Sequence, residues 1–281
     1  MARQEYNGQY YYEQGNKYFY GKGVAINYDE AAKNYRYGAV KGHAAAQACL
    51  GYCYESGKGV TKNLVEAVNW YRKAAVQGYA YAQCNLGFCY ESGIGVTSDI
   101  YEAAKWYKKA AEQEYTRALF CLGNCYRLGN GVKQDYTEAA NLFKKAAEKG
   151  YASAQNNLGW CYEFGRGVKQ DYSLAEKWYA LGAKNGDANA KNNVINIRKK
   201  INESQPAPKK SGEPATQQAP KKSAADFVPL KRKEEPAPQP APKKSADDFV
   251  PLKRKEESAP QKAHDIEYYY DEETKQIRVK R

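Results

Sequence analysis

The sequence is poor in the residues on which most enzymes and membrane proteins depend. It holds two histidines and one methionine in 281 residues. No apolar run approaches the roughly 18–20 residues that cross a bilayer, and the first residues, MARQEYNGQYYYEQ, contain no apolar core of a signal peptide. We therefore expect a chain without a membrane span, located in the cytoplasm or the nucleus.

Proline is missing from the first 205 residues, whereas cysteine and tryptophan are missing after Trp178. This change in composition divides the chain into an aromatic body, residues 1–202, and a tail rich in proline and charge, residues 203–263. The tail has too few apolar groups to offset the entropy of ordering, so we expect it to be disordered. Residues 264–281 alternate around a polar centre, which predicts a short terminal hairpin.

Charge of one sign is in moderate excess. The chain carries 44 basic and 32 acidic residues, a formal net charge of +12. Most of the excess lies in residues 1–200, where there are 27 basic and 18 acidic residues. Such a balance suits an acidic partner or nucleic acid. Because glutamates are interspersed with the lysines and arginines, an excess that solubilises a large surface is the simpler explanation.

The body is built from an internal repeat. The motif Gly-x-Gly-Val recurs without drift every 36 residues, and a Leu-Gly pair, a tyrosine and an alanine keep the same register. A fixed period of this length is the signature of a stacked repeat architecture. The five motifs begin at Gly21, Gly57, Gly93, Gly129 and Gly165.

Each repeat predicts two helices. In the first helix of a repeat, small and apolar residues such as Ala82, Leu86 and Cys89 recur at steps of three and four, which is one helical face. A short polar residue then precedes the second helix and is followed three residues later by glutamate, which predicts a capping box. Leu174 replaces the glutamate in the fifth repeat, so that box should be incomplete. The predicted caps are Asn27, Asn63, Asp99, Asp135 and Asp171.

The second helix alternates large aromatic residues with alanines, as in Trp106, Tyr107 and Ala110. This pattern lets neighbouring helices approach closely. A glycine follows the helix in four of the five repeats, and Glu114 in the remaining one predicts a slightly different turn there. No single repeat can bury its apolar face alone, so the repeats must stack. Residues 187–202 predict one further helix that caps the open end.

These motifs resemble a known family. The pattern Ala-x-x-x-Leu-Gly-x-x-Tyr-x-x-Gly-x-Gly-Val, followed by Asp-x-x-x-Ala-x-x-Trp-Tyr-x-x-Ala-Ala, is similar to the Sel1-like repeat, a relative of the tetratricopeptide repeat. The resemblance covers about residues 7–200, although Gln14 and Asn34 depart from it in the first unit. The resemblance implies an all-α fold, a right-handed α/α solenoid of about five repeats with a capping helix. It also implies that the protein functions as an adaptor.

The residues favour neither catalysis nor a metal site. Cys53, Cys89, Cys125 and Cys161 recur in register with the apolar face, so we expect buried, reduced thiols. With two histidines and no Cys-x-x-Cys, zinc lacks a ligand set, and the glycine turns lack the Lys-Ser/Thr of a phosphate loop. We expect no enzymatic activity and no cofactor.

Binding residues are predicted on the face that turns away from the packed one. A residue two positions after the core leucine is rotated by about 200° from it and should face the inner groove of the solenoid. Residues one and two turns earlier share this face. The alternative is that the rings at these positions pack against adjacent helices. The predicted groove residues are Tyr52, Tyr81, Asn85, Phe88, Arg117, Asn124, Asn157 and Trp160.

The tail contains a second, shorter duplication. KKSAADFVPLKRKEE and KKSADDFVPLKRKEE lie 22 residues apart, and each contains one apolar cluster. Three interpretations remain open besides a plain spacer: a peptide that docks in a partner's groove, an import signal read by an import receptor, and a basic segment that contacts acidic lipid or RNA. The glutamates after each basic cluster weaken the third. The clusters are Phe227, Val228, Pro229, Leu230 and Phe249, Val250, Pro251, Leu252.

Together these patterns predict a non-enzymatic adaptor. A protein or peptide partner would bind in the groove of the solenoid, and the tail motifs would recruit a second partner. The alternative function is that of a nuclear or RNA-associated protein that acts through its basic charge, although the mixed charges make a nucleic-acid partner less favoured.

Overall fold

The computed structural model describes residues 6–204 in full and the backbone of residues 268–271 and 276–279. The two Phe-Val-Pro-Leu clusters of the tail, at 227–230 and 249–252, lie outside the described residues. So does nearly all of the segment predicted to be disordered. The last helix of the body ends at Ser204, two residues after the predicted boundary at residue 202.

The described body consists of helices alone. Each repeat contributes two helices of 13 residues, and a longer helix of 17 residues follows the fifth repeat. The helices are α1 (Gly8–Tyr20), α2 (Tyr28–Val40), α3 (Ala44–Ser56), α4 (Leu64–Val76), α5 (Ala80–Ser92), α6 (Ile100–Glu112), α7 (Thr116–Leu128), α8 (Tyr136–Glu148), α9 (Ala152–Phe164), α10 (Tyr172–Lys184) and α11 (Ala188–Ser204).

A two-stranded antiparallel sheet lies in the terminal segment. Strand β1 (Tyr268–Asp271) pairs with β2 (Gln276–Val279), so that Tyr268 stands opposite Val279 and Asp271 opposite Gln276. Both strands lie within residues 264–281, for which the alternating sequence predicts a short hairpin, and residues 272–275 between them lie outside the described residues.

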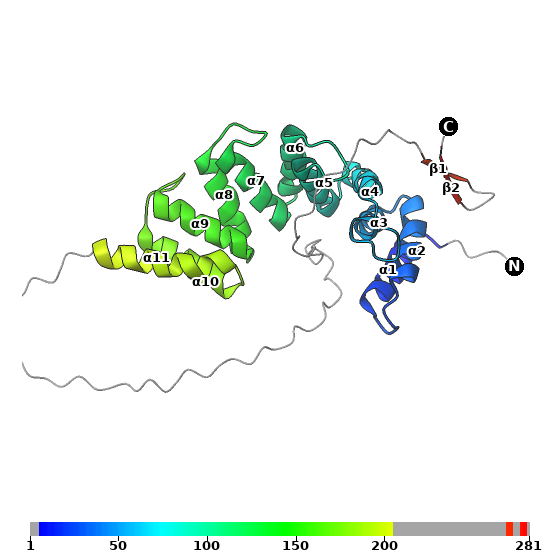
Figure 1. Ribbon diagram of the computed structural model, residues 1–281, viewed down its shortest axis with the longest axis horizontal. Helices are drawn as coiled ribbons and strands as arrows, with labels where there is room; N and C mark the ends of the chain where they lie inside the picture. The colour runs from blue at the N-terminus through cyan, green and yellow to red at the C-terminus, as the bar shows by residue number, and fades with distance from the viewer. Residues whose placement is uncertain (1–5, 205–267, 272–275, 280–281) are drawn as a thin grey trace, which may run out of the picture.

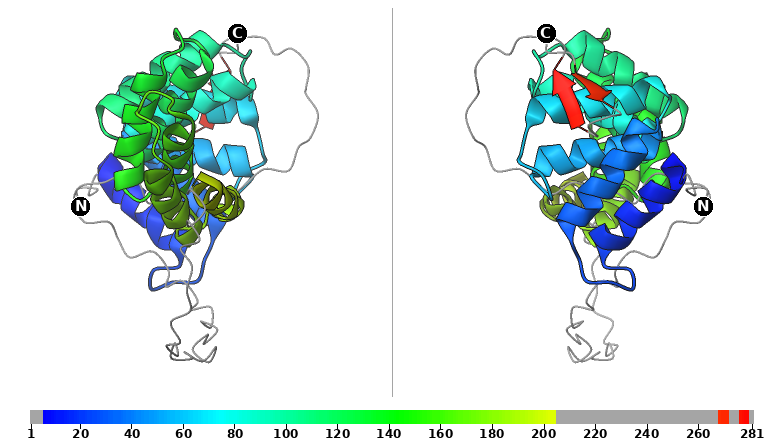
Figure 2. Two further views of the ribbon diagram at one scale, coloured as in Figure 1. Left: turned by 90° about the vertical axis from the view of Figure 1, so that its left-hand side faces the viewer. Right: turned by 90° about the vertical axis from the view of Figure 1, so that its right-hand side faces the viewer.

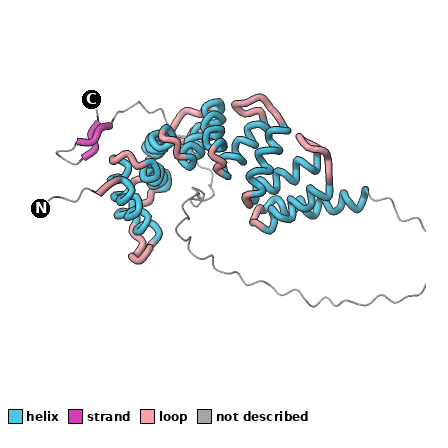
Figure 3. The backbone as a smooth tube through the Cα atoms, turned by 180° about the vertical axis from the view of Figure 1, so that it is seen from behind, coloured by secondary structure: helices cyan, strands magenta, loops and turns pink. Residues whose placement is uncertain are grey.

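The helices stack in chain order into a right-handed α/α solenoid. Each helix packs against its neighbours in the chain, and the array curves into an arch (Figure 1). Viewed from its ends, the array winds about a common axis (Figure 2), and the loops lie at the edges of the stack (Figure 3). The all-α repeat fold is as predicted. In the blue and cyan part of Figure 1, the odd-numbered helices α1, α3 and α5 lie on the inner side of the arch.

In the core of a repeat, the ring of a tyrosine from the second helix packs on a glycine of the first helix. The ring of Tyr107 in α6 lies against Gly87 in α5, where a Cβ would come within 2.8 Å of the ring. Leu86 beside that glycine is fully buried. The pair explains why Leu-Gly in the first helix and tyrosine in the second keep one register: the missing side chain leaves the space that the ring fills. Most repeats use the same contact.

Polar side chains tie each repeat to the previous one. Gln83 is 5% exposed, and its Nε2 donates to the backbone oxygen of Ala75, at the end of the preceding helix α4, at 3.1 Å. Gln47 and Gln155 make the same bond in their repeats, and in repeat 4 the position is held by Leu119. The oxygen of Ala75 also accepts from the backbone N–H of Gly78 at 3.0 Å, so the buried amide supplies a second donor to this carbonyl at the helix end.

The predicted helix caps form, but the capping box is only half correct. The carboxylate of Asp99 accepts from the backbone N–H of Glu102 at 3.0 Å. The backbone N–H of Asp99, which the box assigns to the glutamate side chain, instead donates to the backbone oxygen of Tyr90 at 3.0 Å. This bond recurs in all five repeats and ties the start of the second helix to the first helix. Asp171 therefore caps its helix normally although Leu174 replaces the glutamate.

Glu114 predicted a different turn after α6, but this turn has the same left-handed conformation as the equivalent turns of the other repeats. Glu114 adopts a left-handed conformation with φ 57°, the only described non-glycine residue to do so, and the equivalent Gly78 has φ 88°. The stacked helices on both sides impose this turn whatever residue occupies it. Because Glu114 has a Cβ, its backbone is strained in this conformation, whereas glycine would not be.

Candidate protein-binding face

The structure divides the predicted groove residues into two groups. Phe88, Arg117, Asn124, Asn157 and Trp160 are half-buried, with part of each side chain at the surface. We call these five residues the odd-helix face, since α5, α7 and α9 carry them. The other three predicted residues are buried: Tyr52 is 7%, Tyr81 2% and Asn85 4% exposed. The prediction that they face an open groove is wrong.

The ring of Tyr52, two positions after the core leucine Leu50, packs against the preceding repeat. The ring of Tyr52 lies 6.0 Å from that of Phe19 in α1, and Lys58 covers both rings. A helical wheel gives the direction of a side chain but not the size of what it meets across the repeat boundary. Because an aromatic residue stands at position 19, Tyr52 is covered, and the packing alternative holds there.

Trp160 occupies the equivalent position in the fifth repeat and stays half-buried. Its ring lies 6.2 Å from that of Tyr136 and 5.7 Å from that of Phe164. The residue that corresponds to Phe19 is Arg127, whose guanidinium lies 5.7 Å from the centre of the Trp160 ring. A charged, flexible group thus covers this ring where an aromatic one covers Tyr52.

Arginines and asparagines connect the three helices of the odd-helix face. Nη1 of Arg117 in α7 donates to Oδ1 of Asn85 in α5 at 3.0 Å. Nδ2 of Asn157 in α9 donates to Oδ1 of Asn124 in α7 at 3.2 Å, and Nε of Arg127 donates to the same oxygen at 3.3 Å. The guanidinium of Arg117 lies 5.5 Å from the centre of the Phe88 ring. The face therefore alternates rings with polar donors.

Two residues of this surface escaped the sequence analysis. Arg127 and Phe164 lie near the ends of α7 and α9, and Phe164 is 47% exposed. The signal for Arg127 was present: three other repeats have glutamate at this position, and repeat 4 has arginine. Comparing one position across the repeats would have found it.

The glutamates near the C-terminal ends of α3, α5 and α9 already have hydrogen-bond partners. The hydroxyl of Tyr71 donates to Glu55, that of Tyr107 to Glu91 and that of Tyr179 to Glu163, at 2.7, 2.6 and 2.6 Å. Burial, reinforced by the neighbouring carboxylate, raises the pKa of each of these tyrosines. The hydroxyls therefore remain protonated donors.

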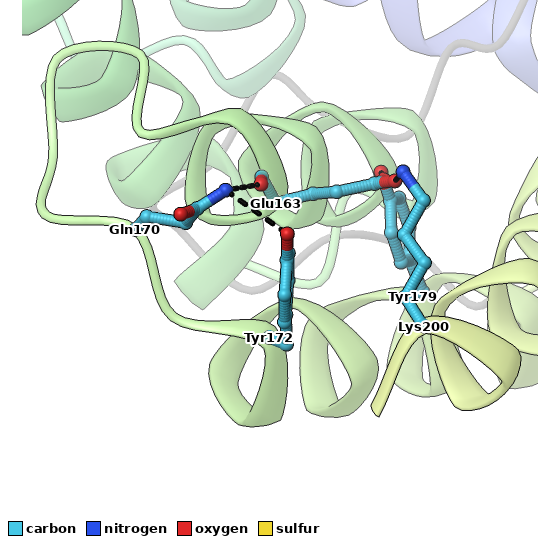
Figure 4. Close-up of polar contacts among 5 residues, drawn as sticks. All are labelled: Glu163, Gln170, Tyr172, Tyr179 and Lys200. Atoms are coloured by element: carbon cyan, nitrogen blue, oxygen red, sulfur yellow. Dashed lines mark hydrogen bonds and ion pairs between the residues drawn. The ribbon is translucent and has the colours of Figure 1, made fainter. Parts of the chain in front are cut away.

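Glu163 shows the fullest set of such contacts. Its carboxylate accepts from the hydroxyl of Tyr179 and from Nζ of Lys200 in α11, the latter at 2.8 Å (Figure 4). Its backbone oxygen accepts from Nε2 of Gln170, which also donates to the hydroxyl of Tyr172 at 3.3 Å. This cluster joins α9, α10 and the capping helix, so its role is to hold the end of the array together.

The cysteines that recur in register with the apolar face lie in the core. Cys53, Cys89, Cys125 and Cys161 are at most 4% exposed, as their register predicts. Within residues 6–204, no group of histidine, cysteine and acidic side chains is arranged to hold a metal ion. None of the described helices is both long enough and apolar enough to cross a bilayer.

The repeat model of one family matches the chain five times in succession. The Sel1 repeat matches residues 8–43, 44–79, 80–115, 116–151 and 152–187. The chain belongs to the Sel1 repeat family. The boundaries coincide with the helix pairs of the structure, since each Sel1 repeat begins at or near the start of an odd-numbered helix.

Solved Sel1 repeat structures are similar in fold. A Sel1 repeat protein from Oxalobacter formigenes is 40% identical, with a TM-score of 0.63, over 69% of this chain and 79% of that one. The protective antigen c5321 of uropathogenic Escherichia coli, which displays the same fold, is 35% identical, with a TM-score of 0.64, over 69% of this chain. The match spans 42% of the antigen, less than half its length. No curated protein matches the chain.

Proposed function

We propose that this Sel1 repeat protein is an adaptor that binds a protein or peptide partner on its odd-helix face. Sel1 repeat proteins typically mediate protein–protein interactions and are generally non-catalytic. The observation that carries the proposal is the half-buried state of Phe88 and Trp160 beside arginines and asparagines. Rings with one exposed side and adjacent hydrogen-bond donors are typical anchors of protein interfaces.

Alanine substitution on this face tests the proposal. Partners are captured from the source cells with the full chain, and the unaltered protein is compared with Phe88→Ala and Trp160→Ala. Loss of an anchoring ring should weaken binding by about 1–3 kcal/mol. Trp106→Ala is the matched control, because Trp106 is also half-buried but lies on α6 under Lys109. Partners that survive both face substitutions and leave with the control would refute the proposed face.

The tail motifs are proposed to recruit a second partner. This rests on their duplication alone, since both copies lie outside the described residues. The same duplication leaves an import receptor among the candidate partners, and with it a nuclear as well as a cytoplasmic location. Phe227→Ala with Phe249→Ala, measured for partner capture, tests the docking interpretation. Substitution of the basic clusters, Lys231-Arg232-Lys233 and Lys253-Arg254-Lys255, measured for location in the cell, tests the import interpretation.

A salt titration separates adaptor binding from the RNA-associated alternative. Binding through phosphate contacts weakens steeply with salt, whereas binding through aromatic anchors does not. A partner that leaves between low and physiological salt and is replaced by free RNA would favour the alternative.

A further inference from the structure

The fourth repeat breaks the charge pattern of the odd-numbered helices. At the position of Arg127 the second, third and fifth repeats have Glu55, Glu91 and Glu163. At the position of Arg117 the same repeats have alanine, tyrosine and serine. Helix α7 therefore places two cations on a surface where its neighbours place neutral or acidic residues. We call Arg117 and Arg127 the arginine pair.

Both arginines lack a carboxylate partner. No ion pair formed by the described residues includes either of them. Each guanidinium carries five N–H donors, and Arg117 and Arg127 each donate to one neutral amide oxygen, on Asn85 and Asn124. The glutamates of the neighbouring odd-numbered helices accept from tyrosine hydroxyls, and none of them forms an ion pair with either arginine.

A second observation shows that this surface is short of acceptors. Asn85 is 4% exposed, and its Nδ2 has no hydrogen-bond partner among the described residues, while its Oδ1 accepts from Arg117. A buried donor without an acceptor costs free energy. The unused surface donors of Arg117 and Arg127 call for a ligand that supplies oxygen acceptors and negative charge, and the unpaired Nδ2 of Asn85 shows the same shortage of acceptors beside Arg117.

The geometry limits the shape of that ligand. Arg117 and Arg127 are ten residues apart on one helix, which corresponds to about 15 Å along its axis. An extended peptide covers that distance in about four or five residues. Arg117 lies over Phe88 and Arg127 over Trp160, so each cation has a ring beside it that can take an apolar side chain.

We propose that the partner segment bound by the odd-helix face is an extended acidic peptide with two carboxylates four or five residues apart, one for each member of the arginine pair. The proposal rests on the proposed function and adds the chemistry of its ligand. A nucleic acid is the less suitable occupant, because it needs a continuous track of cations along its backbone. Two arginines separated by neutral asparagines provide two points of charge.

Peptide selection tests this ligand chemistry. The full chain is used to select from a random dodecapeptide display library, and the enriched peptides are synthesised with a fluorescent label. We expect a consensus with two acidic residues four or five apart. Replacing those two residues by asparagine or glutamine should weaken binding at least tenfold, as for charge pairs at the centre of an interface.

Charge reversal assigns the site. Arg117→Glu and Arg127→Glu should each weaken the selected peptide about tenfold, whereas Lys108→Glu, the same change of charge on an exposed residue of α6, should change it less than twofold. Arg117→Lys keeps the charge and removes the forked donors, and it should retain more binding than Arg117→Glu. Thermal melts of all four variants verify that the fold is kept.

The outcomes separate this inference from the proposed function. Enriched peptides without acidic residues, whose binding Trp160→Ala abolishes, would overturn the acidic ligand and keep the peptide-binding face. Failure to enrich any peptide that Phe88→Ala or Trp160→Ala weakens would overturn both. Binding of labelled poly-U that Arg117→Glu and Arg127→Glu abolish, without an acidic consensus, would replace the peptide by nucleic acid.

Discussion

At the scale of single residues, the array tolerates a local cost where stacking imposes the backbone. Glu114 adopts φ 57° in a turn that glycine makes elsewhere, and its side chain pairs with Lys149 at 3.2 Å. The pair is largely exposed, so it contributes little. The left-handed conformation costs a residue with a side chain roughly 1–2 kcal/mol.

Glu114→Gly should therefore stabilise the protein. Relief of the strain exceeds the lost ion pair and the added entropy of the unfolded chain, so we expect a gain of about 0.5–1 kcal/mol in the free energy of unfolding. Denaturant melts measure it.

Two further variants control this experiment. Glu114→Ala removes the ion pair and keeps the strain, so it should give no gain. Gly78→Ala introduces the strain at an equivalent turn where a Cβ would meet no atom within 4 Å, and it should destabilise. Equal effects of Glu114→Gly and Glu114→Ala would mean that the ion pair, not the backbone, decides.

At the scale of elements, the connecting loops dock each repeat on the one before it. The second glycine of Gly-x-Gly-Val has positive φ, and in the third repeat a Cβ on Gly95 would overlap the backbone oxygen of Leu64 in α4. The loops of the second, fourth and fifth repeats make the same close approach. In the first repeat, Gly23 also has positive φ, but a Cβ there would meet no atom within 4 Å.

Gly95→Ala should consequently cost far more stability than Gly23→Ala. Both changes strain the backbone by roughly 1–2 kcal/mol, and only Gly95→Ala also forces the loop away from α4. Urea melts of the two variants give the difference, which we expect to exceed about 2 kcal/mol, the scale of overpacking a well-packed site. Similar losses of stability in the two variants would show that the glycine is needed for the conformation of its own turn and not for the contact between repeats.

Local patterns predict these elements well, and contacts between elements poorly. The helices, their caps and the buried cysteines follow from periodicity and residue type within one repeat. The bond from the Asp99 amide to Tyr90, and the covering of Tyr52 by Phe19, depend on how one element lies on another. On the candidate face, five of the eight predicted residues remain partly exposed. The other three are buried by residues of neighbouring helices, which the pattern of a single helix does not show.

At the scale of the whole molecule, the stacked core hides groups that ionise at high pH. Burial raises the pKa of Cys53, Cys125 and Cys161 to about 12, from an ordinary value of 9.0. In the unfolded chain these thiols lose their protons near pH 9. Between about pH 9 and 12 the unfolded state therefore holds fewer protons than the folded state.

The free energy of unfolding should fall as the pH rises through this window. Each buried thiol removes up to about 1.4 kcal/mol per pH unit, and the full stabilisation is present below pH 9. Urea melts from pH 7 to 11 measure the slope. Cys125→Ala, which removes one of these thiols, should flatten it by the share of one group. A stability that stays level up to pH 11 would contradict the prediction.

The leucine at position 119 has a mechanical meaning. At three of the four junctions between repeats, a buried glutamine donates a hydrogen bond to the preceding helix. At the junction between the third and fourth repeats, Leu119 occupies this position and cannot make that bond. That joint is secured at its rims by charged side chains, Arg117 to Asn85 on one side and Lys149 to Glu114 on another. Dissolved ions screen the exposed Lys149–Glu114 pair, but they leave the buried amide bonds of the other junctions untouched. The solenoid is thus a row of links of which one lacks the buried amide bond, and the span from Phe88 to Trp160 lies across that junction.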